Sequence, residues 1–234
     1  MPELPAALPP AERTVGQLVA ETIRAYGGDF WRVLPLGLPI AISTQITLGY
    51  DANVQTFVLL AFSPLIALAY LRAAQLVLGA RIIARSFWLA LLIFVPVVFL
   101  ERIFVLPALA WLAFIGLAPI AASLEELGFR AALERGRRLG TADYVHALGS
   151  LAALVIVVVI AELTLIALLR SQGDVGQRIA HGLADLVLSP LLYVGGALLF
   201  VDQAARAVRS ARDASLHPSV DADAAGRPDA QVES

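Results

Sequence analysis

Long runs of hydrophobic residues, separated by short polar segments, form the main pattern of this chain. Six such runs predict helices that cross a bilayer, for which about 20 apolar residues are needed. They cover approximately residues 33–50, 54–78, 86–100, 103–123, 145–169 and 179–201. The pattern therefore predicts an all-α membrane protein with about six transmembrane helices.

The boundary between the third and fourth runs is the least defined. Glu101 and Arg102 are two charged residues within an otherwise apolar stretch. We favour a tight hairpin at this pair, which leaves a short third span. The alternative is a third helix that passes through the pair and turns at Pro107.

Two segments show the 3.6-residue periodicity of amphipathic helices. In residues 14–26 apolar and polar positions alternate between two faces, with Thr14 as a predicted N-cap. In residues 124–140 a sparse apolar stripe is accompanied by acidic and basic residues four positions apart, a spacing that supports a helix. These pairs are Glu126–Arg130, Arg130–Glu134 and Glu134–Arg138. Both segments are too polar to span, and we expect interfacial helices on the cytoplasmic surface.

The two ends of the chain are polar and differ from the apolar interior. Residues 1–12 hold four prolines and predict a disordered leader without the features of a signal peptide. Residues 214–234 are polar and predict a disordered cytoplasmic tail. A single helical membrane domain over residues 13–213 is expected between them.

Composition and charge agree with a membrane location. Hydrophobic residues make up 59% of the chain and charged residues 15%, against about 45–50% and 25% in soluble domains. With the N-terminus inside, only three arginines would flank spans on the outer side, which fits the positive-inside rule. The sequence thus predicts a multi-pass protein of the bacterial inner membrane with both termini in the cytoplasm. The inner arginines would be Arg13, Arg24, Arg32, Arg72, Arg81, Arg85, Arg130, Arg135, Arg137, Arg138, Arg206, Arg209 and Arg212.

Two parts of the chain resemble each other. Each has a Glu, an Arg and a Gly at one spacing, followed by an Asp and an aromatic residue before a span. Ser63-Pro64-Leu65 in the second span also matches Ser189-Pro190-Leu191 in the sixth. Kinks are expected at Pro64 and Pro190, and proline-broken helices in corresponding positions point to a binding site near the midplane. A parallel internal repeat would explain the similarity; chance in an apolar sequence is the alternative.

The segment from Leu106 to Gly149 resembles a family of bacterial polytopic membrane proteins, related to the membrane domain attached to some glycerophosphoryl diester phosphodiesterases. Stand-alone members of that family have no known function. The shared features are Pro119, Glu125 or Glu126, Gly128, Ala132-Leu133-Glu134-Arg135 and Leu139-Gly140. Asp202 and Arg206 fit the family's acidic and basic residues after the last span, whereas Tyr144 stands where a tryptophan is common. The resemblance implies an architecture and no reaction, since the chain has no phosphodiesterase domain.

Ionisable residues inside spans are costly and are functional candidates. Glu162, His181 and Asp185, with Glu101 and Arg102, would all lie in the outer half of the membrane. One interpretation is a polar cluster that lines an outward cavity or a proton path. The interpretation we favour pairs Glu162 with an arginine and leaves His181 and Asp185 at the interface.

No catalytic motif accompanies these residues. The sequence has no cysteine, no HExxH pattern and no glycine-rich phosphate loop. We therefore predict no catalytic residue, no cofactor, no metal site and no enzyme activity.

The favoured function is a non-catalytic membrane module that binds lipid or a partner protein. Arg130, Arg135, Arg137 and Arg138 are the candidate contacts with anionic lipids or that partner. One alternative is the membrane subunit of an ATP-driven exporter, which would need a soluble ATPase as partner. The other is a small secondary transporter that uses Glu162 and Asp185. Membrane lipids are the expected partners in each case, and nucleic acid is not.

Overall fold

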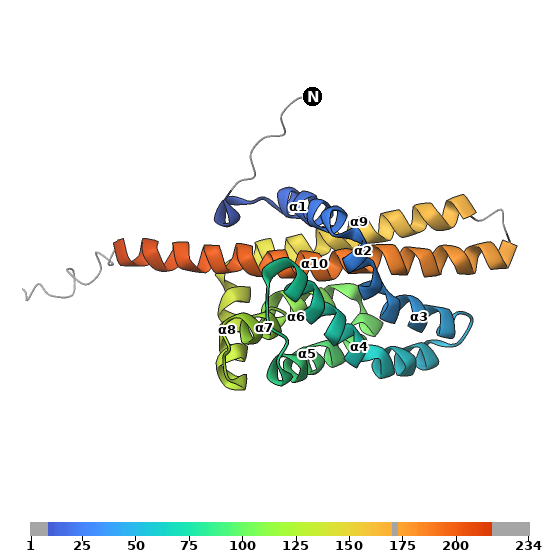
Figure 1. Cartoon of the computed structure of the whole chain (residues 1–234), viewed down its shortest axis with the longest axis horizontal. Helices are drawn as coiled ribbons and strands as arrows, with labels where there is room; N and C mark the ends of the chain where they lie inside the picture. The colour runs from blue at the N-terminus through green and yellow to red at the C-terminus, as the bar shows by residue number, and fades with distance from the viewer. Residues whose placement is uncertain (1–8, 170–172, 217–234) are drawn as a thin grey trace, which may run out of the picture.

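The computed structural model describes residues 9–169 and 173–216, which form helices and contain no strand. The predicted disordered segments were 1–12 and 214–234; residues 10–12 form a short helix and α10 continues to residue 216, while residues 1–8 and 217–234 lie outside the described residues. Figure 1 shows the order of the elements. They are η1 (Pro10–Glu12), α1 (Val15–Gly28), α2 (Phe30–Val33), η2 (Leu34–Gly37), α3 (Leu38–Thr47), α4 (Ala52–Leu78), α5 (Ala84–Ile103), α6 (Val105–Ile115), α7 (Ala118–Leu124), α8 (Phe129–Ala142), α9 (Tyr144–Leu169) and α10 (Gly173–Leu216).

Five helical segments are long and apolar enough to cross a membrane: α4, α5, α6 with α7, α9 and α10. The all-α character is therefore confirmed, and these five helices agree with a multi-pass membrane protein. The predicted first span, 33–50, is a chain of the short elements α2, η2 and α3 and is not among the five. Pro35, Gly37 and Pro39 explain this, because proline lacks the amide hydrogen of a regular helix and glycine weakens its interior.

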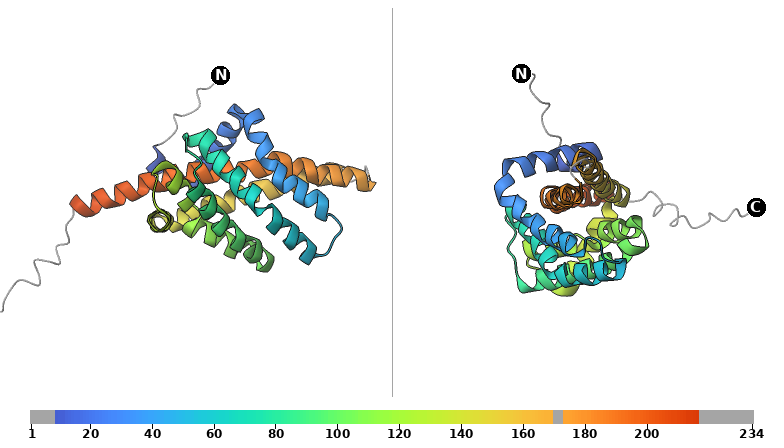
Figure 2. Two further views of the ribbon diagram at one scale, coloured as in Figure 1. Left: turned by 60° about the horizontal axis from the view of Figure 1, so that its bottom comes forward. Right: turned by 90° about the vertical axis from the view of Figure 1, so that its right-hand side faces the viewer.

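Helix α10 is the element around which the others pack. It contacts α9, α3, α4, α1 and α8 (Figures 1 and 2). Its 44 residues extend over about 66 Å, roughly twice the thickness of a bilayer core. The helix therefore continues well beyond both ends of the predicted span 179–201.

The two ends of the helix bundle differ in charge. One end holds η1, the α4–α5 link, α8 and the start of α9, and we call it the arginine-rich end. Its arginines are Arg13, Arg81, Arg85, Arg130, Arg135, Arg137, Arg138, Arg206 and Arg209. The opposite end holds the α3–α4 and α5–α6 turns, the end of α9 and the start of α10 (Figure 1).

The α5–α6 turn lies close to the hairpin predicted at Glu101-Arg102, but not at it. Both residues belong to the last turn of α5, and the chain turns at Phe104, whose backbone is extended. Pro107, the turn in the alternative prediction, lies inside α6, where the first turn of a helix tolerates proline.

Helix α1 begins at the residue that the sequence predicted, but its packing differs from the prediction. Thr14 accepts a hydrogen bond from the amide of Gln17, whose side chain accepts one from the amide of Thr14 in return, so the pair forms a capping box. Leu18, Thr22 and Tyr26 are buried, and the Tyr26 hydroxyl donates to the carbonyl of Val187 on α10 at 2.8 Å. The apolar stripe of α1 therefore faces α9 and α10 instead of a lipid surface.

Helix α8 begins at Phe129, five residues after the predicted start of 124. Glu126 lies in the preceding link with a positive φ of 51°, so the pair Glu126–Arg130 cannot form along a helix. The pair Glu134–Arg138 is present at 3.2 Å. A Cβ added at Gly136 would lie 2.5 Å from the Cβ of Ala118, so this helix packs closely on α7.

Pro64 and Pro190 both lie inside continuous helices, α4 and α10. Pro64 cannot donate to the carbonyl of Leu60, and the hydroxyl of Ser63 donates to that carbonyl at 2.7 Å instead. In α10 the Ser189 hydroxyl donates to the carbonyl of Asp185 at 2.6 Å. The carbonyl that Pro190 leaves free is that of Leu186, so the two serines do not make the same bond. The internal repeat and the kinks stay predictions.

Candidate functional site

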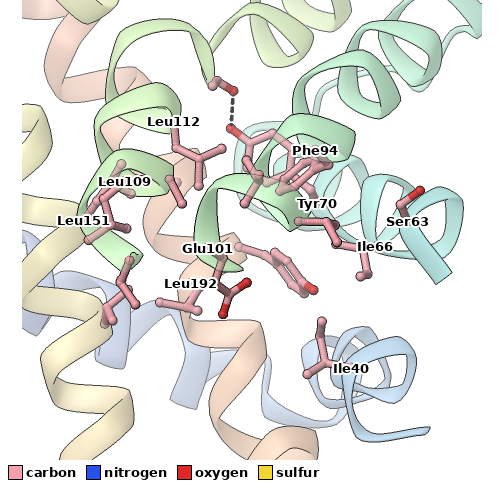
Figure 3. Close-up of a pocket in the computed structure, with 18 of the residues that line it drawn as sticks. Ile40, Ser63, Ile66, Tyr70, Phe94, Glu101, Leu109, Leu112, Leu151 and Leu192 are labelled. Carbon is pink, nitrogen blue, oxygen red and sulfur yellow. Dashed lines mark hydrogen bonds between the residues drawn. The ribbon is translucent and has the colours of Figure 1, made fainter. Parts of the chain in front are cut away.

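An apolar cavity of about 330 Å³ lies between α3, α4, α5, α6, α9 and α10. Figure 3 shows its lining side chains, which are mostly aliphatic and aromatic. Helices far apart in sequence build it: Ile66 and Tyr70 come from α4, Leu109 from α6, and Leu151 from α9. The volume is within the range of small-molecule sites, which are mainly apolar with a few polar groups.

Four polar side chains line this cavity, and two of them donate hydrogen bonds to backbone carbonyl groups. The Tyr70 hydroxyl donates to the carbonyl of Gly116 at 2.9 Å, a bond drawn in Figure 3, and Ser63 donates to Leu60. Within residues 9–169 and 173–216, neither Glu101 nor the Tyr193 hydroxyl has a hydrogen-bond or ion-pair partner. The Glu101 carboxylate is directed among the apolar lining side chains (Figure 3).

A smaller polar hollow of about 240 Å³ lies at the opposite end, between α3 and α4. Ser43, Thr44, Thr47 and Gln55 line it, together with Leu59. Leu59 also lines the apolar cavity, so the two spaces are neighbours.

Three of the five predicted intramembrane polar residues come together between α9 and α10. His181 Nδ1 lies 3.4 Å from Glu162 Oε1, and both side chains are about 30% exposed. Asp185, one turn further along α10, lies beside Thr44 of α3, and its Oδ2 atom has no partner in the described residues. Within the described residues the partner of Glu162 is a histidine, where we favoured an arginine; Arg170, which follows α9, lies outside the described residues.

The remaining two, Glu101 and Arg102, lie apart from that cluster at the end of α5. Arg102 reaches the start of α4, where it donates to the carbonyl of Ala52 and, at 3.1 Å, to the side-chain oxygen of Asn53. Arg102 therefore joins two helices, and only Glu101 faces the cavity.

The most extensive polar cluster lies at the arginine-rich end, and the sequence did not single it out as a site. Asp202 of α10 is completely buried, and its Oδ1 accepts from Arg13 at 3.0 Å. His146 Nε2 of α9 lies 3.9 Å from the Asp202 Oδ2 atom. These three residues connect the start of the chain to the last two helices.

Arg206 extends this cluster on α10. It donates to Asp143 Oδ2 at 2.8 Å and to the carbonyl of Arg13 at 2.6 Å. Gln203, also buried, exchanges two hydrogen bonds with the backbone of Asp143, at 3.2 and 3.1 Å. An aspartate and an arginine four residues apart at the end of an apolar helix are the signal that could have indicated this network.

The four arginines of α8 that we predicted as lipid or partner contacts face solvent to different degrees. Arg137 and Arg138 share Glu134, and Arg135 pairs with Glu125 at 2.9 Å. The two guanidinium groups hold the pKa of Glu134 below its usual value. Arg130 is exposed and has no ion pair within the described part of the chain. Two glutamates thus offset part of the positive charge of this surface.

Comparisons of the chain with protein-family models, with curated proteins and with solved structures give no match. The resemblance to the phosphodiesterase-associated membrane family therefore stays a prediction. The candidate site must be judged on its geometry alone.

Proposed function

We propose that this chain is a membrane protein that binds an amphipathic, lipid-like molecule and holds the apolar part of that molecule in the central cavity. The observation that supports this is the cavity itself, about 330 Å³ with an almost wholly apolar lining. Each buried methylene group of a ligand is worth about 0.8 kcal/mol. Water gains little there, because it needs two to four polar partners to occupy a buried site.

The position of the cavity favours the bilayer as the source of the ligand. Its walls are helices that are long and apolar enough to cross a membrane. Helix α9 is the most apolar of them, and few of its residues are buried within the fold. Leu151 and Val155 of this helix line the cavity and are partly buried, while Ile156 and Ile160 are exposed. A single helix thus separates the cavity from the surrounding lipid.

The proposal includes the membrane and the orientation that the sequence predicts. The arginine-rich end would lie in the cytoplasm of a bacterial cell, following the positive-inside rule. The α2–η2–α3 chain would be a sixth, broken crossing alongside α10, with which α3 and η2 are in contact. Helix α8 would then place Arg130 and its neighbours at the anionic inner leaflet.

The test is to fill the cavity with a bulky side chain. Val155 is partly buried and lines the cavity, whereas its neighbour Ile156 on α9 is 56% exposed. A dodecanol with a photoreactive diazirine on its chain is added to purified protein in nanodiscs, and labelled residues are identified by mass spectrometry. Labelling of cavity-lining residues in the native protein should fall to background in Val155→Trp and persist in Ile156→Trp.

Labelling confined to the exposed faces of the helices in the native protein would contradict this function. Equal labelling of the cavity in both tryptophan variants would do the same, since the space would not be the site. The exposed face of α9 should be labelled in every variant and provides the internal standard.

Secondary transport is a second candidate, supported by the approach of Glu162, His181 and Asp185. Such groups can carry a proton in exchange for a substrate. Glu162→Gln should then abolish proton-dependent uptake into liposomes. Unchanged flux in that variant would exclude a proton path through this cluster.

A further inference from the structure

We infer that the ligand of the central cavity carries an organic ammonium group, which is held by the carboxylate of Glu101. This rests on the proposed function and specifies the class of its ligand. Glu101 is the only charged side chain that lines the apolar cavity in the described part of the chain. A carboxylate beside apolar walls is a costly arrangement unless a positive charge or hydrogen-bond donors compensate it.

The protein itself supplies no such compensation to Glu101. Its neighbour Arg102 points away and is bound to oxygen atoms of α4, at Ala52, Asn53 and Thr56. No ion pair of Glu101 exists within residues 9–169 and 173–216, although nine other acidic residues of that part form one with arginine or histidine. The ligand is therefore the natural source of the missing positive charge.

The position of Glu101 suits an amphipathic cation. The residue is exposed and lies in the last turn of α5, so it stands at the mouth of the cavity near the opposite end. Apolar side chains line the cavity behind Glu101, including Leu109 and Leu112 of α6 (Figure 3). A ligand with its apolar body among these side chains would place its polar group at the carboxylate.

Tyr193 offers a second contact for this group. The residue is buried, lines the same cavity and has no hydrogen-bond partner for its hydroxyl within the described residues. A hydroxyl oxygen can accept from an ammonium N–H, and aromatic rings also attract organic cations. An anionic head group could accept from the Tyr193 hydroxyl, but it would be repelled by Glu101.

The experiment uses three diazirine probes with the same dodecyl chain and different head groups: dodecylamine, dodecanol and dodecyl phosphate. In native protein in nanodiscs, the amine should label cavity-lining residues about tenfold more than the alcohol, because a bond to a charged group is worth roughly that factor. The phosphate should label them least. In Glu101→Gln the preference for the amine over the alcohol should disappear.

Glu21→Gln is the matched control. It removes a carboxylate of α1 that does not line the cavity and is paired with Arg24, so the amine preference should remain. Glu101→Asp keeps the charge and should keep a clear preference. Retention of the amine preference in Glu101→Gln would show that the Glu101 charge does not select the ligand, and would overturn the inference.

The outcomes separate this inference from the proposed function. Cavity labelling by the alcohol without any preference for the amine would leave an apolar site and refute the ammonium group. No cavity labelling by any probe would refute both. Given an amine preference, displacement by phosphatidylethanolamine in the nanodisc would identify a bilayer lipid as the source. Amine labelling that persists in the presence of this lipid would identify a lipophilic amine from solution as the ligand. Either result supports the ammonium group.

Discussion

The two polar clusters between α9 and α10 differ in how completely the protein encloses them. At the arginine-rich end, Asp202 is 0% exposed and accepts from Arg13, and Arg206 bonds to Asp143. In the other half of the same helix pair, Glu162 and His181 are about 30% exposed. His181 Nδ1 lies 3.4 Å from Glu162 Oε1, which is longer than the 3.0 Å between Arg13 and Asp202. One cluster is an interlocked network, and the other is a pair at the edge of the fold.

The difference indicates which part of the helix pair is fixed. The buried network joins three segments, η1 with the start of α1, the start of α9 and the middle of α10, so its geometry constrains all three. The exposed pair joins only α9 and α10. We therefore expect the arginine-rich end to stay rigid and the opposite end, next to the mouth of the cavity, to move when a ligand enters.

The largest expected effect comes from Asp202→Ala. Removal of one partner from a buried ion pair leaves the other charge without compensation, which costs about 3–5 kcal/mol. Unfolding of the purified protein in mixed detergent micelles, followed by circular dichroism, measures this change. Asp213→Ala, on an exposed position of the same helix, should change stability by less than about 0.5 kcal/mol. A cost for Asp202→Ala as small as that of Asp213→Ala would mean that the network contributes nothing.

Gly37→Ala tests whether the middle of the bundle is as tightly packed as the arginine-rich end. A Cβ at Gly37 would lie 2.2 Å from the carbonyl oxygen of Leu186, which is a backbone atom that cannot move aside alone. Overpacking of this kind costs about 1–3 kcal/mol. Gly27→Ala is the control, because nothing lies within 4 Å of its Cβ position and alanine favours the helix by about 0.5–1 kcal/mol. Thermal unfolding should therefore shift in opposite directions in the two variants.

The sequence predicted the parts of this fold that depend on local information. The apolar run that forms α9 is long enough to define a helix by length alone, and its predicted span 145–169 lies within one residue of the observed bounds. The N-cap at Thr14 needs only a neighbour three residues away. The broken first span was missed, because apolar composition outweighed Pro35, Gly37 and Pro39 in the prediction.

The candidate sites depend on distant residues and could not be read from one sequence. Arg13 and Asp202 are 189 positions apart, and the cavity takes its lining from six elements. The sequence indicated Glu101 as a costly charge within the membrane. It indicated Arg102 equally, so it could not tell which of the two faces a site. Only the packing of α5 against α4 directs one of them into the cavity and the other to the start of α4.

Of the variants that remove a contact, Glu162→Gln should have the smallest effect on stability. The carboxylate loses its contact with His181, but pairs that are partly exposed contribute only about 0–1 kcal/mol, and glutamine keeps an oxygen that can accept from the imidazole. The same detergent unfolding experiment should therefore give a change below about 1 kcal/mol, several times smaller than for Asp202→Ala. A larger loss would show that the pair is enclosed in the membrane by lipid or by a second chain. The contrast between the two ends would then not hold. The part of the helix pair that moves when a ligand enters would have to lie elsewhere along α9 and α10.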